Sequence, residues 1–495
     1  NKMNIKLNML YKMRWLFACL ALVSVASCQK ALDINVDPNK ALNASPNLVL
    51  PAAQVEMGLT VGNTWNFVGS MWAQYWTGGH GVSSSGLEYY TMQSVDVQSA
   101  WTRSYERCLQ DLNYLIKSDE PIYAGMAKIC TAYEYQMLVD LFGDIPFSEA
   151  LKGDEGIFIP KFDKEADVYA ALVPLIEDGI ADIQSTDPAA AVPGNDDLMY
   201  GGDINKWIAF ANTLKLKVLI RKGDFVAAKT LVQSGATFIG DNADNAQISW
   251  NESTKNTNPL WARFNSRTGI EMYYVASSTI IAQLNALSDP RIDFLFNKPS
   301  KPAPHSPHKG VNSGDVNEDP QYLPPNYTGS DVDRRANFSQ PSALVFASNT
   351  PTIFISAWES KFLQAEALIR NGDDGSTLFG EGVQLSFDYL GAGNAAAYIT
   401  SLSFGGTMDA QLNTLAVQKW ISMTSLQMAE GWVETVRFNR AGNEIFTNGI
   451  FSSPLLNTIG ANKYPTSFVY PTQEIALNPN TPNRTVTDKR FWDAN

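Results

Sequence analysis

The chain has 495 residues, with 37 Lys or Arg against 50 Asp or Glu, a net charge of −13. Such an acidic chain repels phosphate backbones and anionic lipid, which argues against nucleic acid as a partner and against a basic membrane-docking patch. The sequence holds three histidines and lacks a zinc-binding H-E-x-x-H helix, a G-x-S-x-G elbow and a phosphate-binding glycine loop. No catalytic residue, metal or cofactor is therefore predicted.

The first 27 residues are predicted to be a lipoprotein signal peptide. Four basic residues and no acidic one precede an apolar run from Trp15 to Ala26, which is too short to span a bilayer. The run closes on Val-Ala-Ser-Cys, which resembles a bacterial lipobox in which Cys28 is acylated. Residues 28–46 are polar and predict a tether. A plain secretory signal with an incidental cysteine is the alternative.

Removing this signal leaves 468 residues, with 33 basic against 50 acidic side chains and a net charge of −17. No second apolar run approaches membrane-spanning length. Membrane attachment is therefore predicted to depend on Cys28 alone, and residues 47–495 are predicted to form a single domain.

Apolar residues that recur at three- and four-residue steps predict helices along most of this domain. A stripe from Trp101 to Ile116 predicts a helix over about 97–117, and Pro121 begins a second that ends at Phe142. The short turn between them predicts an antiparallel hairpin. Further helices are predicted over 166–183, 204–221, 224–234, 355–369, 380–390, 393–402 and 408–438. Strand signals are few and short, so the predicted fold is mainly α, with helices in pairs.

The hairpin places Cys108 and Cys130 at similar heights on the two apolar helix faces. Packed helix axes lie about 8–10 Å apart, whereas a disulfide needs Cα atoms within about 7 Å. Two neighbouring free thiols are therefore predicted, and a disulfide is the alternative.

Residues 298–342 are rich in Pro, Gly, Asn and Asp and show no periodicity. They predict a loop-rich insertion, and loops of that length in compact domains are often functional. Tyr322 and Tyr327 favour a functional role here. His305 and His308 could share a metal, but in such a loop they are expected to be solvated.

Several sequence blocks together resemble the SusD/RagB-like outer-membrane lipoproteins, and most closely the second SusD-like subfamily. These blocks are Asp-Ile-Asn-Val-Asp-Pro-Asn at 33–39, Tyr135 through Ala150, Lys206-Trp207 with Asn212 through Leu216, Phe362 through Ala367, and Tyr470-Pro471 with Glu474 and Asn478. The resemblance implies tetratricopeptide-like helix pairs and an irregular half that carries the ligand site. It departs at Arg437-Phe438-Asn439-Arg440, where the family often has Arg-Arg-Thr-Gly.

The resemblance also implies a role. Family members cap a TonB-dependent outer-membrane barrel and capture nutrients, most often glycans, for import. The expected protein is a lipid-anchored binding protein, displayed on the cell surface, that delivers oligosaccharide to a SusC-like barrel. An oligopeptide ligand and a secreted glycoside hydrolase are the alternatives.

Two aromatic clusters are the candidate ligand sites, because sugar rings stack on aromatic faces while amides and charged groups bind hydroxyls. The first combines glycines and serines with Trp72, Tyr75, Trp76, Tyr89 and Tyr90. The second contains Asn258, Trp261 and Tyr273. For both clusters a place in the core is the alternative. By contrast Trp101, Trp207, Trp358 and Trp420 lie on periodic apolar faces and are predicted to be core.

Overall fold

A computed structural model describes residues 44–78, 86–252, 255–265, 274–299, 307–314, 337–440, 442–454 and 456–493. Contacts divide the chain into two compact units, Asn1–Ser45 and Pro46–Asn495, and every helix and strand named below lies in the second. The predicted signal, Cys28 and most of the tether lie outside the described residues. None of the helices in the described ranges is long and apolar enough to cross a membrane.

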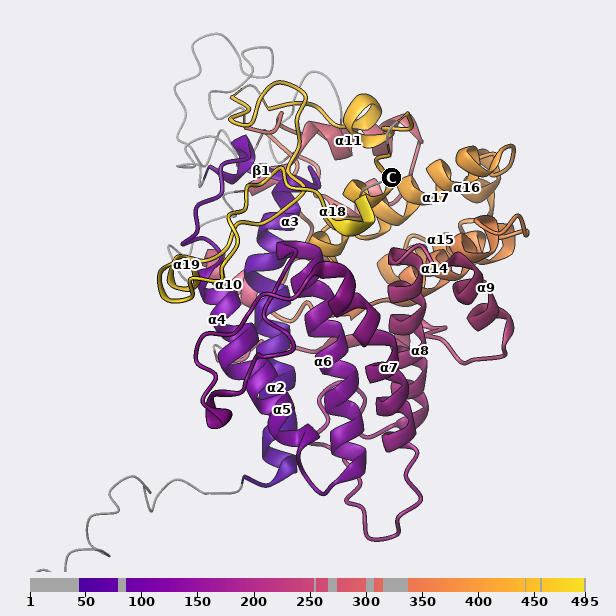
Figure 1. Ribbon diagram of the computed structural model, residues 1–495. Helices are drawn as coiled ribbons and strands as arrows, with labels where there is room; N and C mark the ends of the chain where they lie inside the picture. Colours follow the sequence, from indigo (N-terminus) through magenta and orange to yellow (C-terminus); the bar gives the residue numbers. More distant parts are fainter. Residues whose placement is uncertain are drawn as a thin grey trace, which may run out of the picture. The chain divides into compact units, whose positions relative to one another are not determined.

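Helices build the first part of this second unit (Figure 1). Residues 46–72 and 98–116 each form one continuous helix with a π-helical segment inside it. The helices are α2 (Pro46–Thr60), η1 (Val61–Trp65), α3 (Asn66–Trp72), α4 (Gln98–Thr102), η3 (Arg103–Leu109), α5 (Gln110–Ile116), α6 (Pro121–Phe142), α7 (Glu165–Ile183), α8 (Ile204–Arg221) and α9 (Phe225–Gln233). The helices predicted from residue 97 to residue 234 are confirmed, to within one residue at each end.

The ends of these helices follow from local chemistry. Pro121 occupies the first turn of α6, where its missing N–H costs no hydrogen bond. The Asp203 carboxylate accepts hydrogen bonds from two backbone N–H groups at the start of α8, and Asp224 caps α9 in the same way. Gly143 ends α6 with φ +88°, a left-handed conformation that favours glycine.

Most remaining helices belong to the second half of the unit. They are α10 (Pro259–Asn265), α11 (Ser278–Ala286), α12 (Ile292–Leu295), α14 (Ala357–Ile369), α15 (Ser376–Leu390), α16 (Ala396–Ser401), α17 (Met408–Ser422), α18 (Met428–Phe438) and α19 (Thr472–Leu477). The helical segment predicted over 408–438 is confirmed as two helices, because the chain breaks between α17 and α18, where Ser425 has φ +65°. Short turns complete the set: η2 (Leu87–Tyr89), η4 (Gly153–Glu155), η5 (Asn242–Asp244), η7 (Phe446–Ile450) and η8 (Phe491–Asp493).

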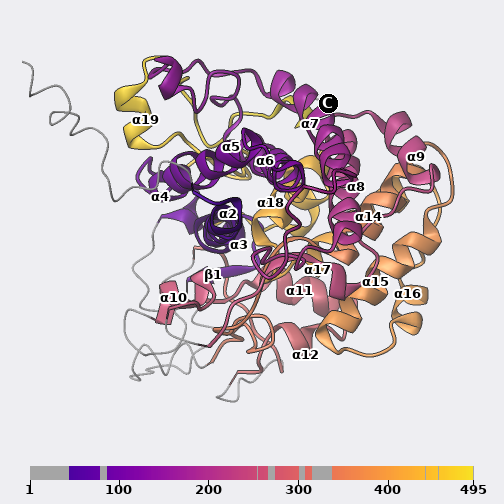
Figure 2. The same cartoon turned by 90° about the horizontal axis from the view of Figure 1, so that it is seen from below.

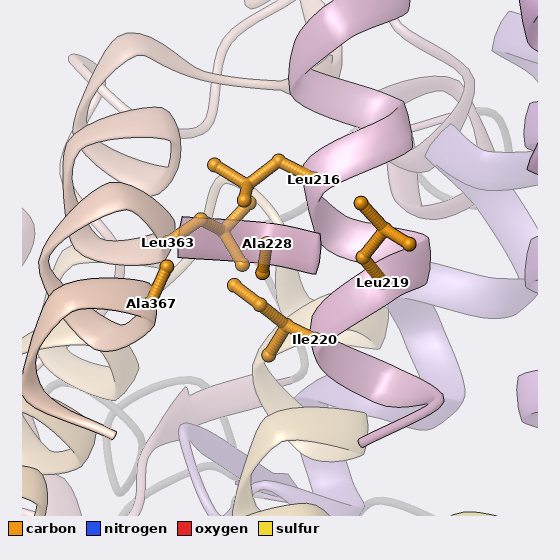
Figure 3. Close-up of a cluster of buried hydrophobic side chains, with 6 residues drawn as sticks. All are labelled: Leu216, Leu219, Ile220, Ala228, Leu363 and Ala367. Atoms are coloured by element: carbon orange, nitrogen blue, oxygen red, sulfur yellow. The ribbon is translucent and has the colours of Figure 1, made fainter. Parts of the chain in front are cut away.

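The helices pack in pairs, as predicted. Helices α6, α7 and α8 lie side by side in both Figure 1 and Figure 2. Helices α6 and α7 approach closely at two glycines: a Cβ added to Gly125 would lie 2.7 Å from the Gly179 carbonyl oxygen. Figure 3 shows a hydrophobic cluster in which side chains of α8, α9 and α14 point toward one another: Leu216, Leu219, Ile220, Ala228, Leu363 and Ala367.

Strands are few and short in the described residues, which confirms that part of the prediction. Strand β1 (Trp76–Gly78) pairs antiparallel with β3 (Tyr274–Ala276), and β2 (Ala246–Ile248) with β4 (Thr352–Ile355). The β1–β3 pair joins segments that lie about 200 residues apart in the sequence. The sheet pairs a strand that contains Trp76 of the first aromatic cluster with a strand that begins next to Tyr273 of the second.

A network of buried charges ties the two halves together. Its cations and carboxylates are equal in number, and each side chain is at most 4% exposed: Lys217, Arg221, Arg370, Lys419 and Arg437 with Asp140, Glu359, Glu366, Glu430 and Glu434. The members come from α6, α8, α14, α17 and α18 and the residue after α14. Equal numbers matter because an unpaired charge in the interior is strongly destabilising.

Arg437 is the most heavily bonded member of this network. Its guanidinium binds both carboxylate oxygens of Glu366 at 2.6 Å and one of Glu434 at 2.6 Å. Burial opposes ionisation of Glu366, but the nearby Arg437 and Arg370 outweigh it and lower the pKa of this carboxyl to about 2. Glu366 therefore stays ionised at any pH at which the protein is handled.

Cys108 and Cys130 are both free and buried, as predicted. Burial raises the pKa of both thiols well above the usual value. Nearby Glu134 raises the pKa of Cys108 further, and Asp197 and Glu134 raise that of Cys130. These thiols are therefore protonated and unreactive in the folded protein.

Glu134, on α6 beside these cysteines, is a buried carboxyl without a cationic partner among the described residues. Burial raises its pKa to about 7, and the Ser104 hydroxyl opposes this shift only in part. Between about pH 5 and 7 the Glu134 carboxyl therefore keeps its proton in the folded state but loses it in the unfolded state. Because the folded state binds more protons in this range, the free energy of unfolding falls as the pH rises.

We expect Glu134→Gln to stabilise the protein, because the amide removes the cost of ionising a buried group. The gain in the free energy of unfolding should be near zero at pH 5 and approach about 3 kcal/mol at pH 8. Urea denaturation at several pH values measures it. The exposed Glu155→Gln is the matched control and should change stability equally little at every pH. A gain from Glu134→Gln that does not vary with pH would contradict the assignment.

Candidate functional site

The structure places four rings of the first aromatic cluster in the core. Trp72, Tyr75, Trp76 and Tyr90 are each at most 1% exposed. A sugar stacks on a ring only where one face is open, so these four residues are reassigned from the ligand site to the core. Trp101, Trp207, Trp358 and Trp420 are also buried, as predicted.

Each of the four reassigned rings has defined contacts in the core, and the Tyr90 hydroxyl, for example, accepts a hydrogen bond from the Gln74 amide at 3.0 Å. The Trp72 ring packs edge-on against Trp432. The Tyr75 hydroxyl donates to the Trp420 carbonyl at 2.6 Å, and the Trp76 indole N–H donates to the Ser425 hydroxyl at 3.0 Å. Polar tips that find partners inside the protein are typical of buried Tyr and Trp. The glycines and serines that follow Trp76 suggested an open loop, but Trp76 and Gly78 belong to strand β1, and residues 79–85 lie outside the described residues.

Tyr89 is the member of this cluster that remains accessible, because its side chain is only half-buried. Its carbonyl accepts hydrogen bonds from the backbone and side chain of Thr458 at 3.0 and 2.8 Å. Gly314 supports the ring: a Cβ at that position would lie 2.8 Å from two ring carbons, and its φ of +71° favours glycine. The Tyr89 ring is therefore held in place before any ligand arrives.

Glu88 precedes Tyr89 in the chain and is buried. Burial raises the pKa of its carboxyl, and the backbone N–H groups of Glu88 and Gly78 oppose the shift. Neither carboxylate oxygen has a hydrogen bond of good geometry. The Glu88 carboxyl is therefore a buried polar group next to the accessible Tyr89 in the chain.

The second cluster is also divided by the structure. Asn258 is buried and caps α10: its carbonyl oxygen accepts from the N–H groups of Leu260 and Trp261, and its amide donates to the Thr350 carbonyl. Asn258 is therefore a structural cap and not a free ligand contact. Trp261 is half-buried and stays a candidate. Tyr273 lies outside the described residues.

Arg263 and Asn312 extend the polar part of this surface. Both side chains are exposed. The Arg263 guanidinium lies 4.2 Å from the centre of the Phe67 ring and donates to the Asn63 side chain at 3.0 Å. Asn312 accepts a hydrogen bond from the Ser278 hydroxyl at 2.6 Å. Asn312 carries no sequence signal of its own, because its loop has no periodicity.

The small sheet connects Tyr89 with Arg263 through a chain of contacts. Gly78 pairs with Tyr274 in the β1–β3 register, and the Tyr274 ring contacts Phe67, over which Arg263 lies. On the other side, the Gly314 N–H donates to the Thr77 hydroxyl, and Gly314 supports Tyr89. We call the set Tyr89, Trp261, Arg263 and Asn312 the sheet-edge surface. It offers two partly open rings, an amide and a guanidinium.

His308 corrects another prediction. It is buried and not solvated, and its Nε2 lies 2.7 Å from a carboxylate oxygen of Asp293. His305 lies outside the described residues. In the part of the chain that the structure describes, no three potential metal-ligating side chains come together.

Of the hollows elsewhere on the described surface, two are lined in part by aromatic side chains. One, with a volume of about 500 Å³, lies between α4, η3 and α19. The other, of about 340 Å³, is lined by Trp432, Phe451 and Tyr464 together with Lys463 and Lys489. Neither includes a residue of the sheet-edge surface.

Comparisons with known proteins agree with this architecture. A family model described as SusD-like, starch-binding and associating with the outer membrane, matches residues 38–471. A solved chitin-binding protein superposes with a TM-score of 0.73 at 22% identity, covering 91% of this chain and 100% of its own. A SusD/RagB family protein from Bacteroides thetaiotaomicron superposes with a TM-score of 0.68 at 22% identity, covering 91% and 99%.

A SusD homologue from Bacteroides uniformis is similar as well, with a TM-score of 0.72 at 19% identity, covering 90% of this chain and 99% of its own. No curated protein matched the sequence. At these identities the solved structures establish the fold alone. The evidence for the family is the family model, which covers most of the chain.

Proposed function

The chain belongs to the SusD-like family, and on that premise we propose that it binds an oligosaccharide at the outer membrane and passes it to a transporter. The observation that carries the proposal is the family match over residues 38–471, because the family is described by starch binding and outer-membrane association and not by a catalysed reaction. The chain is accordingly proposed to be a binding protein and not an enzyme.

The sheet-edge surface supports oligosaccharide as the ligand. Tyr89 and Trp261 supply partly open rings for the C–H faces of sugars, and the exposed Asn312 and Arg263 supply hydrogen-bond donors for hydroxyl groups. The solved chitin-binding neighbour suggests chitin fragments, and the family description suggests starch fragments, as the first ligands to test.

The membrane part of the proposal rests on the N-terminal sequence. The lipobox-like ending at Cys28 supports lipid anchoring, which would hold a water-soluble domain at the outer membrane. Delivery to a SusC-like TonB-dependent barrel, with the protein facing the cell exterior, completes the proposed role. The family's association with the outer membrane supports this placement.

Isothermal titration of the purified protein with maltooligosaccharides, chitooligosaccharides and oligopeptides tests the proposal. We expect binding of at least one oligosaccharide. Tyr89→Ala and Trp261→Ala should each weaken it by about 1–3 kcal/mol, the scale of stacking on an aromatic ring. Tyr114→Ala, which removes a partly exposed ring on α5, is the matched control and should leave affinity unchanged.

Other results would redirect the proposal. Binding of peptides alone would replace the ligand while keeping the transport role. Turnover of any ligand in the panel by the pure protein would overturn the assignment as a binding protein. Undiminished affinity in both ring variants would move the site away from the sheet-edge surface.

A further inference from the structure

The hollow of about 340 Å³ lies beside α18, and we call it the α18 hollow. Its walls come from α18, from the residues around Phe451, from the segment 462–466 and from the segment 487–493. Figure 1 shows the C-terminal part of the chain, in yellow, next to α18. The volume is within the range of small-molecule sites.

Hydrogen bonds between these segments hold the walls in place. The Trp432 indole N–H donates to the Pro465 carbonyl at 3.1 Å. Thr466 donates twice, from its N–H to the Val486 carbonyl at 2.8 Å and from its hydroxyl to the Asp488 carbonyl at 3.0 Å. The hollow therefore has its shape before a ligand arrives, and such preorganisation lowers the entropic cost of binding.

Two lysines, Lys463 and Lys489, line the hollow. Both are exposed, and within the described residues neither forms an ion pair with a carboxylate. The Lys489 ammonium lies 3.5 Å from the backbone oxygen of Asp493. Because the chain as a whole has a net charge of −13, a concave spot with two unpaired cations attracts anionic groups that most of the surface repels.

The Asp493 carboxyl also lines the hollow. Burial raises its pKa to about 6, and the nearby Lys489 opposes this shift. The carboxyl is therefore ionised at pH 7.5, where the described lining carries two positive charges and one negative charge. The excess of positive charge favours a ligand that carries a carboxylate of its own.

Amides and aromatic rings complete the lining. The Asn439 side-chain oxygen accepts two hydrogen bonds from Thr447, which leaves the Asn439 NH₂ group open. The Asn462 side chain is exposed and forms no hydrogen bond within the described residues. The half-buried rings of Phe451 and Tyr464 lie with centroids 5.7 Å apart. Amides suit hydroxyl groups, rings suit C–H faces and ammonium groups suit a carboxylate, so the lining matches an acidic sugar.

One segment connects this hollow with Tyr89. The Tyr464 ring packs against the Tyr90 ring with centroids 5.9 Å apart, and Tyr90 follows Tyr89 in the chain. Thr458, six residues before Tyr464, donates to the Tyr89 carbonyl from both its backbone and its side chain. The hollow therefore adjoins a ring that we propose to bind sugar, which favours a sugar as its own ligand.

We propose that the α18 hollow binds a carboxylate-bearing sugar, with Lys463 and Lys489 on the carboxylate and the Asn439 and Asn462 amides on hydroxyl groups. The proposal rests on the proposed function, which supplies an oligosaccharide as the ligand class. It adds that this oligosaccharide contains acidic residues of the uronic acid type. The lysines then select for charge, a task that the sheet-edge surface does not perform.

Isothermal titration of the purified protein at pH 7.5 tests the proposal. The probes are oligomers of galacturonic, glucuronic and mannuronic acid, each compared with its methyl ester, which has the same rings without the charge. Wild-type protein should bind at least one of the acids about tenfold more tightly than its ester, because only the acid forms charge-assisted hydrogen bonds with the two ammonium groups. Lys463→Met/Lys489→Met should remove this preference.

Asp493→Asn gives a test in the opposite direction. The amide removes a negative charge from the lining, so the variant should bind the acid about two- to fivefold more tightly than wild type and the ester equally well. A gain in affinity cannot result from damage to the fold. Unchanged affinity for the acid would contradict the place of its carboxylate beside Asp493 and overturn the proposed arrangement.

The matched control is Lys117→Met/Lys222→Met, which removes two exposed lysines outside the hollow and should keep the preference for the acid. Circular dichroism of every variant checks the fold. Equal affinity for acid and ester in wild type would overturn the assignment. So would a preference that persists in Lys463→Met/Lys489→Met.

The remaining outcomes separate this site from the proposed function. Binding of neutral oligosaccharides without binding of any acid would overturn the α18 hollow and leave the proposed function intact. Equal competition by acetate or inorganic phosphate would reduce the hollow to a general anion site and overturn the sugar. Tighter binding of an acidic peptide through the same lysines would overturn it as well. Binding of no oligosaccharide, neutral or acidic, would overturn both proposals.

Discussion

Replacing Arg437 with Met should lower the free energy of unfolding by about 3–5 kcal/mol, the usual cost of removing one partner from a buried ion pair. The variant leaves Glu366 and Glu434 with one cation fewer in a buried network whose cations and carboxylates are equal in number. Burial of these carboxylates is tolerable only because Arg437 and its neighbours lower their pKa values. Urea denaturation followed by far-UV circular dichroism measures the loss.

Two companion variants separate charge from geometry and from burial. Arg437→Lys keeps the charge but loses the two parallel hydrogen bonds to Glu366, so it should fall between wild type and Met. Lys229→Met removes a partly exposed partner of Asp373 and should cost less than about 1 kcal/mol. If Arg437→Met costs no more than Lys229→Met, the network contributes nothing beyond a surface pair.

Replacing Trp76 with Ala should lower the free energy of unfolding by about 3–5 kcal/mol, as expected for a large core side chain. The ring is 0% exposed, packs edge-on against Phe346 and donates its N–H to Ser425. Its removal leaves a cavity and an unpaired Ser425 hydroxyl. Thermal and urea denaturation measure the change.

Two comparisons sharpen this result. Trp207→Ala, another fully buried indole, should cost a similar amount. Tyr89→Ala should cost clearly less, because its ring is half-buried. A Trp76→Ala protein of near wild-type stability that had lost oligosaccharide affinity would return Trp76 to the ligand site.

The helices could be predicted from the sequence wherever one face is apolar and the ends carry caps. Helix α8, with its apolar stripe and the Asp203 cap, is an example. The break between α17 and α18 could not be predicted in this way, because neither glycine nor proline marks it. Ser425 adopts a positive φ there and receives the Trp76 N–H, so tertiary contacts and not local preference hold the break.

The candidate site was predictable only in part, because composition does not reveal which face of a ring is open. Trp76 and Tyr89 lie in the same glycine- and serine-rich stretch, yet one is buried and the other half-exposed. The two clusters were found separately, but their connection through β1 and β3 depends on a pairing across 200 residues that no local pattern encodes. The hollow between α4, η3 and α19 likewise joins residues from three distant segments.

The last residues of the described chain are hydrogen-bonded to the C-terminal end of helix α6. The Arg490 guanidinium donates to the carbonyls of Asp140 and Leu141, and the Trp492 indole donates to the Asp140 carboxylate, across 352 positions of sequence. Contacts between residues so far apart in the sequence can form only after nearly the whole chain has been synthesised. Such contacts also slow folding, because a long loop must close before they form. The early helices thus complete their packing only when the C-terminal end arrives, and the domain should fold and unfold cooperatively.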